Sequence, residues 1–194
     1  MEKGLFVVFE GIDGSGKSSC MASVAEALKG KDVIVTSEPT RSKIGMLIRS
    51  SGNIMPETEA LLFTADRAEH TAEIKKWIGD KNIVLCDRYY ASTVAYQSAY
   101  AGGRAVDTEW LLRMNDKVII QPDVTFLFDI DPEKGLERVE SRGEKSKFER
   151  LEFLSEVRKN YLKIAKKFSF VVIDASRSRE EVFADVMKHI SKLI

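Results

Sequence analysis

The chain has 194 residues, of which 44% are hydrophobic and 31% charged, a balance typical of globular rather than disordered or fibrous proteins. Its 30 lysines and arginines equal its 30 aspartates and glutamates, so no global basic charge indicates a nucleic acid partner. Cys20 and Cys86 are too few for a disulfide framework. No signal peptide precedes the first strand pattern, and no apolar stretch approaches the roughly 20 residues that span a bilayer. We therefore expect a cytoplasmic protein with no membrane partner.

Short apolar runs alternate with helical patterns along the chain. No internal repeat, low-complexity tract or Pro/Gly-rich linker interrupts them, so residues 1–194 are expected to form a single domain. Continuous runs rich in Val, Ile and Phe are typical of strands buried on both faces of a parallel sheet. Five such runs are present: Leu5–Phe9, Val33–Val35, Ile83–Cys86, Val124–Phe128 and Phe170–Ile173.

Two helices are predicted in the first half of the chain. The first follows the first strand and is expected to end near Gly30, a residue common just after helices. The second is long, beginning at Pro56 and stopping near Gly79. The residues expected to face the core are Met21, Val24, Ala25 and Leu28 in the first helix, and Leu61, Ala65, Ala68 and Ala72 in the second.

Further helices are predicted in the second half. Asp131 with Pro132 forms an N-cap followed by proline at the first helical position, and Ser178 with Glu181 forms a capping box. The core-facing stripes are Leu151, Leu154, Val157, Tyr161 and Ile164 in one helix, and Val182, Val186 and Ile190 in the last. The alternation predicts a doubly wound, three-layer α/β fold around a parallel five-stranded sheet, with right-handed crossovers. Ligands of such folds bind at the carboxyl ends of the strands.

A phosphate-binding motif follows the first strand directly. The segment Gly11-Ile12-Asp13-Gly14-Ser15-Gly16-Lys17-Ser18 matches G-x-x-x-x-G-K-[ST] between a strand and a helix, the context that this P-loop motif requires. Glycines let backbone N–H groups turn toward a phosphate, and the helix N-terminus adds partial positive charge. We predict that this segment and Ser19 bind a nucleoside triphosphate. Lys17 would be a solvent-facing ligand of the β- and γ-phosphates, and Ser18 a ligand of Mg²⁺.

The third strand is expected to end at the same crevice, in Asp87-Arg88-Tyr89. A carboxylate there beside the P-loop suits the hydration shell of Mg²⁺, so Asp87 is a second candidate metal residue. Arg88 could clamp a second phosphate. A surface turn pair is the plainer interpretation of these two residues, and their position at the crevice favours the functional one. The nearest approach to a guanine-reading motif, Asn115-Asp116-Lys117-Val118, is not one.

The long helix carries Phe63 and Arg67, which are four residues apart and therefore share a helix face. Together they offer an aromatic ring for stacking and a planar donor fork for the edge of a base. A core phenylalanine and a solvated arginine are the plainer alternatives. His70 follows Asp66 by four residues, which favours a structural pair over a catalytic one.

Several motifs, in this order, are similar to those of the thymidylate kinase family, and the likeness extends over nearly the whole chain. They are the P-loop, Glu38-Pro39-Thr40, Leu62–Arg67 with His70, Asp87-Arg88-Tyr89 with Ser92-Thr93 and Tyr96-Gln97, and Arg138 to Arg142-Gly143-Glu144 with Glu149. The resemblance implies a P-loop NTPase fold with a short helical lid at about residues 138–150. It implies an ATP-dependent dTMP kinase that uses Mg²⁺, serves dTTP biosynthesis and forms a homodimer.

The resemblance also implies roles for individual residues. Asp13 would bind the 3′-hydroxyl of dTMP, Phe63 would stack on thymine, Arg67 would donate to its O4, and Arg88 would hold the dTMP phosphate. Tyr96 would lie against the sugar and crowd out a 2′-hydroxyl. The remaining dTMP-binding residues would be Glu38, Thr93, near the base edge, and Gln97.

On the donor side, Arg138, Arg142 and Lys147 would belong to the lid over ATP. The P-loop has Gly14 where some eukaryotic members place an arginine, so the resemblance implies that a lid residue, Arg142, joins Lys17, Arg88 and Asp13 as a catalytic residue. The lid segment is as rich in acids as in bases, so a solvated, self-paired helix face is the alternative.

Two other functions stay open. One is a P-loop kinase for another nucleotide or a nucleoside, and the other is a catalytically silent nucleotide-binding switch. The presence of Lys17, Ser18, Asp87 and Arg88 together argues against the silent switch, because a decayed enzyme is expected to lose some of them.

Overall fold

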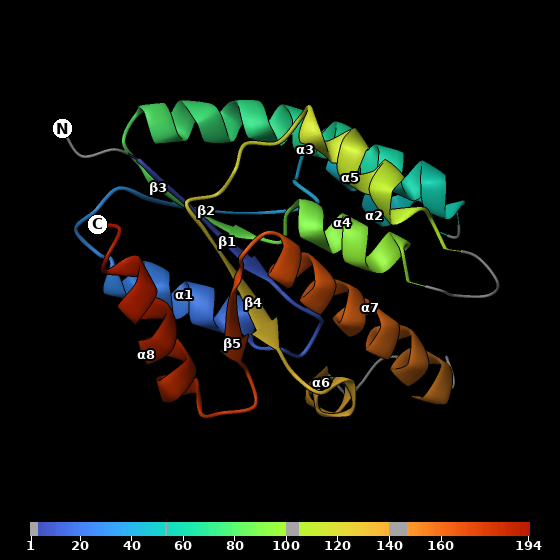
Figure 1. The fold of residues 1–194 in the computed structure, drawn as a ribbon. Helices are drawn as coiled ribbons and strands as arrows, with labels where there is room; N and C mark the ends of the chain where they lie inside the picture. Colours follow the sequence, from blue (N-terminus) through green and yellow to red (C-terminus); the bar gives the residue numbers. More distant parts are fainter. Residues whose placement is uncertain (1–3, 53, 100–104, 140–146) are drawn as a thin grey trace.

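The structure, a computed structural model, describes residues 4–52, 54–99, 105–139 and 147–194. Its centre is a five-stranded, all-parallel sheet with the strand order β2-β3-β1-β4-β5 (Figure 1). The strands are β1 Leu5–Glu10, β2 Val33–Ser37, β3 Ile83–Asp87, β4 Val124–Asp129 and β5 Val171–Asp174. The five predicted strands are confirmed, and each extends past its apolar run into polar residues. The carboxyl ends of the strands therefore carry polar residues: Glu10, Ser37, Asp87, Asp129 and Asp174.

Helices cover both faces of the sheet, giving the three layers that were predicted. In Figure 1, α1 and α8 lie on one face, and α3, α4, α5 and α7 lie on the other. The helix bounds are α1 Lys17–Ala27, α2 Lys43–Ser50, α3 Pro56–Gly79, α4 Tyr90–Gln97, α5 Thr108–Asp116, α6 Pro132–Val139, α7 Lys147–Lys167 and α8 Arg179–Ile190. The short helices α2, α4 and α5 were not predicted, and α1 ends at Ala27, before Gly30.

The prediction that all strands are buried on both faces is wrong for the edge strands. Every residue of β1 is buried, whereas Val35 of β2 is 52% exposed and Val172 of β5 is 49% exposed. An edge strand has a neighbour on one side alone, so the helices that cross over the sheet cover it less completely than the central strands.

The helix ends agree with their local sequence signals. Ser178 and Glu181 form the predicted capping box at α8, and Asp131 Oδ1 accepts a hydrogen bond of 3.0 Å from the backbone N–H of Glu133 at α6. The core stripe of α8, Val182, Val186 and Ile190, is buried as predicted. Among the described residues, no helix is long and apolar enough to cross a membrane.

The long helix α3 has the predicted bounds but buries a different face. Leu61 is 52% exposed, and Ala65 and Ala72 are exposed as well. The buried residues of α3 are Ala60, Thr64, Asp66, Arg67, His70, Thr71 and Ile74. The face toward the protein interior is therefore largely polar, which apolar periodicity could not predict.

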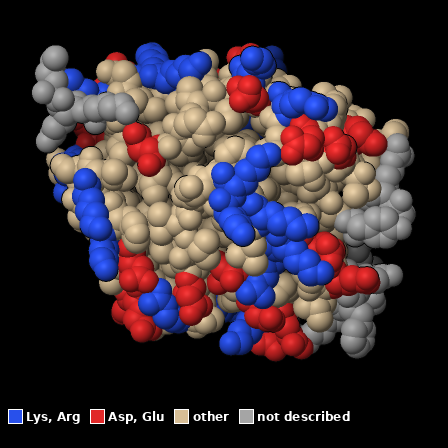
Figure 2. All heavy atoms as spheres, viewed as in Figure 1, with Lys and Arg blue, Asp and Glu red and all other residues tan. Residues whose placement is uncertain are grey.

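Figure 2 shows lysine and arginine side chains interspersed with acidic side chains over one face of the molecule. This distribution accords with the equal numbers of basic and acidic residues. Any strong positive electrostatic potential on this face must therefore come from a local group of cations and not from the net charge of the protein.

Candidate active site

The P-loop joins the carboxyl end of β1 to the first turn of α1. Gly14 and Gly16 have φ angles of 80° and 84°, in the left-handed region that glycine adopts without steric cost. A Cβ at Gly14 would lie 2.1 Å from the carbonyl oxygen of Gly135 in α6. The P-loop and α6 therefore pack backbone against backbone, and this contact leaves no room for a side chain at position 14.

The other P-loop residues differ in exposure. Gly11, Ile12 and Ser15 are buried, whereas Ser18 and Ser19 at the start of α1 are exposed. The Ser15 hydroxyl has no hydrogen-bond partner among the described residues. A buried donor of this kind in a phosphate-binding loop suits an anionic ligand.

Lys17 is only 6% exposed, which corrects the prediction of a solvent-facing side chain. Side chains in the first turn of a helix point back toward its N-terminus, so Lys17 lies over the loop. Its Nζ is 3.8 Å from Asp13 Oδ1 and 4.0 Å from Asp87 Oδ1. Burial lowers the pKa of the Lys17 ammonium group and Arg88 lowers it further, while Asp87, Asp13 and Glu10 oppose the shift.

The two predicted metal residues lie together. The Ser18 hydroxyl donates a hydrogen bond of 2.5 Å to Asp87 Oδ2. The other carboxylate oxygen, Oδ1, is buried and accepts no hydrogen bond from the described residues. Within the described part of the chain, no group of three or more His, Cys, Asp or Glu side chains could hold a metal ion. One hydroxyl and one carboxylate suit Mg²⁺, which usually combines one or two protein ligands with phosphate oxygens and water.

Arg88 follows β3 in a left-handed backbone conformation with φ 70°. Its N–H donates to the carbonyl oxygen of Phe9 at 2.9 Å, and the Cys86 thiol donates to its carbonyl oxygen at 3.0 Å. The guanidinium donates to Asp13 Oδ1 at 2.6 Å and lies 5.3 Å from the ring centroid of Tyr96. The predicted catalytic residues Asp13, Lys17 and Arg88 therefore converge at one place.

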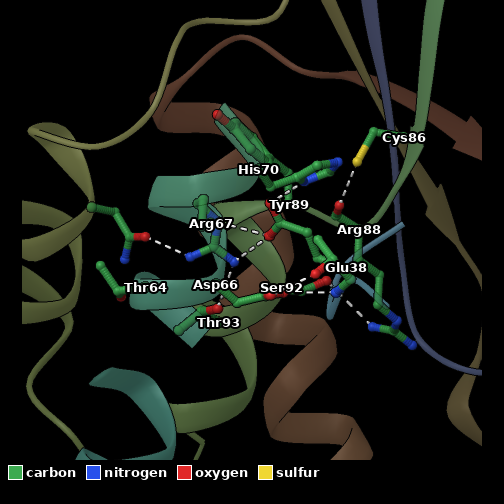
Figure 3. Close-up of polar contacts among 12 residues, drawn as sticks. Glu38, Thr64, Asp66, Arg67, His70, Cys86, Arg88, Tyr89, Ser92 and Thr93 are labelled. Atoms are coloured by element: carbon green, nitrogen blue, oxygen red, sulfur yellow. Dashed lines mark hydrogen bonds and ion pairs between the residues drawn. The ribbon is translucent and has the colours of Figure 1, made fainter. Parts of the chain in front are cut away.

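A buried ion-pair network links α3 to the end of β2 (Figure 3). Arg67, 1% exposed, donates through Nε to Glu38 Oε2 at 2.8 Å, and His70 Nδ1 lies 3.0 Å from Glu38 Oε1. Arg67 also donates to Thr93 Oγ1 at 3.0 Å and to Asn115 Oδ1 at 2.6 Å. Glu38 thus holds Arg67 directly, and the partners of the guanidinium come from three parts of the chain: the segment after β2, α4 and α5.

The predicted pairing of Asp66 with His70 is wrong. Asp66 accepts hydrogen bonds from the Thr40 backbone, the Thr40 hydroxyl and the Ser42 hydroxyl at 2.7, 2.6 and 2.8 Å, whereas His70 Nε2 lies 2.8 Å from Thr36 Oγ1. Asp66 and His70, on consecutive turns of α3, therefore bind two different parts of the chain: the segment after β2 and β2 itself.

The remaining predicted acceptor residues belong to α3 and α4. Phe63 and Tyr96 are half-buried, and Thr93 is buried. Gln97, at the end of α4, donates to Glu59 of α3 at 2.9 Å. A cavity of about 260 Å³ is lined by Asp13, Tyr96, Leu136, Val139, Arg150, Phe153 and Leu154.

The predicted lid is described only at its two ends. Arg138 donates to the carbonyl oxygens of Gly14 at 3.4 Å and Ala175 at 3.1 Å, so it holds the P-loop to the segment after β5. Arg142 lies outside the described residues, as does the side chain of Lys147. Arg150 lines the cavity that also contains Asp13.

Three buried residues of the site were missed by the sequence interpretation. Asn115 was considered only as part of a guanine motif, Tyr161 only as a core residue, and Glu10 not at all. Asn115 and Glu10 are 0% exposed, and Tyr161 is 1% exposed. The polar Glu10 directly after a continuous apolar strand was the available signal, because such a residue stands at the carboxyl edge of the sheet.

Comparison with known proteins gives consistent matches. The family model described as thymidylate kinase matches residues 9–186. A protein of Archaeoglobus fulgidus named "Probable thymidylate kinase" is 42% identical over 194 residues, covering 98% of this chain and 96% of that protein. Proteins with the same name from Methanosarcina mazei and Pyrobaculum calidifontis are 41% and 40% identical, over 99% and 97% of this chain and 98% and 96% of their own lengths.

Proposed function

Because this chain belongs to the thymidylate kinase family, we propose that it transfers the γ-phosphoryl group of ATP to dTMP, giving dTDP for dTTP biosynthesis. The observation that carries the proposal is the meeting of Lys17 and Arg88 at Asp13, with Nζ at 3.8 Å and Nη2 at 2.6 Å from the same carboxylate oxygen. A P-loop cation and a second cation from the next strand end suit two phosphate groups that must approach each other.

The chemistry requires cations rather than a general base. The nucleophile is an oxygen of the acceptor phosphate, whose second pKa is near 6, so the group is mostly ionised at neutral pH. Unit charges about 4 Å apart repel by roughly 1 kcal/mol in water but by about 4 kcal/mol at an effective dielectric constant of 20. Lys17 and Arg88 offset this repulsion and the charge that spreads over the transferring group. We assign to Arg142, in the lid, the same role of offsetting negative charge, and we assign Arg138 to the binding of ATP.

Ser18 and Asp87 would hold Mg²⁺. When bound, the ion neutralises charge on the donor phosphates. The short contact between the Ser18 hydroxyl and Asp87 Oδ2 supports this assignment, as does the buried Oδ1, which accepts no hydrogen bond from the described residues and lies 4.0 Å from Lys17 Nζ. The P-loop residues from Gly11 to Ser19 would bind the phosphates of ATP.

The acceptor base would lie near α3 and α4. Phe63 would stack on thymine, Arg67 would donate to its O4, Thr93 would lie near the base edge, and Gln97 would be a further dTMP-binding residue. The network of Glu38 and Asn115 around Arg67 supports a preorganised donor fork, because each partner removes a rotamer that the guanidinium could otherwise adopt. Tyr96 would contact the sugar, and Asp13 its 3′-hydroxyl.

We further propose a cytoplasmic homodimer whose partners are small molecules, with no nucleic acid or membrane partner. Adjacent helices α2 and α3 expose Met46, Leu47 and Leu61 to 59%, 51% and 52%, and Met55 between them is 50% exposed. Exposed large apolar side chains on two adjacent helices suit a self-complementary contact. Sedimentation equilibrium measures the oligomeric state directly, and a monomer at micromolar protein concentration would refute the proposed homodimer.

A panel of acceptors tests the function. We expect kcat/KM to be highest for dTMP among dTMP, dUMP, UMP, CMP, AMP, thymidine and the ribose analogue of dTMP, in an assay coupled to ADP release. A higher value for another acceptor would identify a different small-molecule kinase. ATP binding without transfer to any acceptor would identify a silent switch. Lys17→Ala provides the control for contaminating kinases, because it should retain less than about a tenth of wild-type kcat, a barrier difference above about 1.4 kcal/mol.

A further inference from the structure

Glu10, the last residue of β1, is a fully buried carboxylate that the proposed chemistry does not use. Its Oε1 accepts hydrogen bonds from the backbone N–H groups of Tyr89 and Ser92, at 2.9 and 3.2 Å. Its Oε2 accepts from the Ser92 hydroxyl at 2.6 Å and from the Tyr161 hydroxyl at 3.1 Å. The side chain therefore joins β1 to α4 and α7.

Two of these bonds satisfy the N-terminus of α4. The first N–H groups of a helix have no partner within it, and the N-cap residue Tyr89 supplies no side-chain cap. Glu10, on a distant strand, accepts the N–H of Tyr89 and also that of Ser92, which the Tyr89 carbonyl oxygen shares at 3.1 Å. A negative charge at this end of α4 also interacts favourably with the helix dipole.

The same contacts constrain Arg88. Tyr89, whose N–H is held by Glu10, is the next residue along the chain, so the left-handed turn at Arg88 is anchored at its exit. Arg88 Nη1 donates to the Ser92 hydroxyl at 3.3 Å, and this hydroxyl in turn donates to Glu10. Backbone and guanidinium of Arg88 are thus both tied to one carboxylate.

The surroundings of Glu10 place hydrogen-bond donors on both of its carboxylate oxygens. Burial raises its pKa above the ordinary value, while the hydrogen bonds from Ser92, Tyr89 and Tyr161 and the positive charge of Arg88 oppose the rise. A buried carboxylate is costly unless donors compensate it, and the donors to Glu10 all belong to the segment that presents Arg88 or to α7.

We propose that Glu10 is a positioning residue for Arg88. By capping α4 and holding Ser92, it fixes the guanidinium where the phosphate of the monophosphate acceptor binds. This inference rests on the proposed function. Glu10 does not touch either substrate, so its removal should weaken the acceptor side while the donor side stays intact.

The test is a double-mutant cycle measured as kcat/KM for dTMP at high enzyme concentration, with the KM for ATP as second readout. We expect Glu10→Gln, which keeps the side-chain shape, to lower kcat/KM for dTMP about tenfold, and Glu10→Ala about a hundredfold, with the KM for ATP within about twofold of wild type. In an Arg88→Ala background, Glu10→Gln should change kcat/KM by less than about twofold, because the residue through which it acts is gone.

Asp129→Asn is the matched control. Asp129 also ends a central strand, and its carboxylate is held by Arg158 of α7 at 2.6 and 2.9 Å. We expect this variant to show no selective loss for dTMP. An equal tenfold effect of Glu10→Gln with and without Arg88, or an equal loss for ATP and dTMP, would overturn the positioning role alone. A wild-type protein that does not phosphorylate dTMP would overturn the proposed function and this inference with it. Should Glu10→Ala fail to fold, Glu10→Gln decides.

Discussion

Replacement of Arg88 by alanine is the most informative perturbation of the acceptor side. Its guanidinium is held by Asp13 at 2.6 Å and by Ser92 at 3.3 Å, and it lies over the ring of Tyr96. A hydrogen bond to a charged group contributes about 1.5–3 kcal/mol, and an arginine fork makes two of them to a phosphate. We therefore expect Arg88→Ala to lose about 3–6 kcal/mol of transition-state stabilisation, a decrease of roughly 10² to 10⁴ in kcat/KM for dTMP.

The backbone at Arg88 provides a second, independent comparison. A φ of 70° costs a residue with a Cβ roughly 1–2 kcal/mol, and glycine adopts it freely. Arg88→Gly should therefore be more stable toward urea than Arg88→Ala by about 1 kcal/mol, after allowance for the greater entropy of unfolded glycine. Both variants should lose the same activity, because both lack the guanidinium.

Steady-state kinetics with varied dTMP and titration calorimetry with ATP separate the two substrates. ATP affinity should change little in either variant, because the P-loop supplies the donor ligands. An equal loss of affinity for ATP and dTMP would place Arg88 on the donor side or in the scaffold. Recovery of activity in Arg88→Gly would show that the alanine variant had failed through its backbone.

Two further predictions follow from packing and burial. In urea unfolding, Gly14→Ala should destabilise the protein by about 2–5 kcal/mol and Gly16→Ala by about 1–2 kcal/mol. Both glycines have positive φ, but only a Cβ at Gly14 would meet the Gly135 carbonyl oxygen. Equal losses of stability would exclude this close contact as the cause. Burial raises the pKa of the Cys20 thiol to about 11 and that of Cys86 well above its ordinary value. At pH 8 only about a thousandth of Cys20 is thiolate, so a disulfide reagent should modify both cysteines far faster in denaturant, and equally fast native labelling would contradict this burial.

The sequence predicted the parts of the fold that local patterns determine. Continuous apolar runs identified all five strands, and the capping box of Ser178 and Glu181 located α8 because its signal lies within four residues. The helix α4 could not be found in this way. The N–H groups of Tyr89 and Ser92 at its start donate to Glu10, 79 residues before Tyr89, and a cap supplied from a distant strand leaves no local signature.

The candidate site was predicted unevenly for the same reason. Asp13, Lys17, Ser18, Asp87 and Arg88 were expected to converge because a motif and a strand end have defined places in this architecture, and the structure brings them together. The burial of Lys17 and the contacts of Asn115 with Arg67 depend on how helices pack onto the sheet. Contacts of that kind join residues that no short segment contains.

The helix α3 shows why apolar periodicity fails near a binding site. Its Leu61 and two of its alanines face outward, and its buried side carries Asp66, Arg67 and His70. Each buried polar group has partners, so the cost of burying it is offset within the network. If the inner face serves the acceptor base, the exposed Leu61 needs its own explanation, and Met46 and Leu47 are exposed on adjacent α2. Under the proposed function the inner side is polar because it serves the acceptor base, and under the proposed homodimer a second copy of the chain would cover the exposed Leu61, Met46 and Leu47.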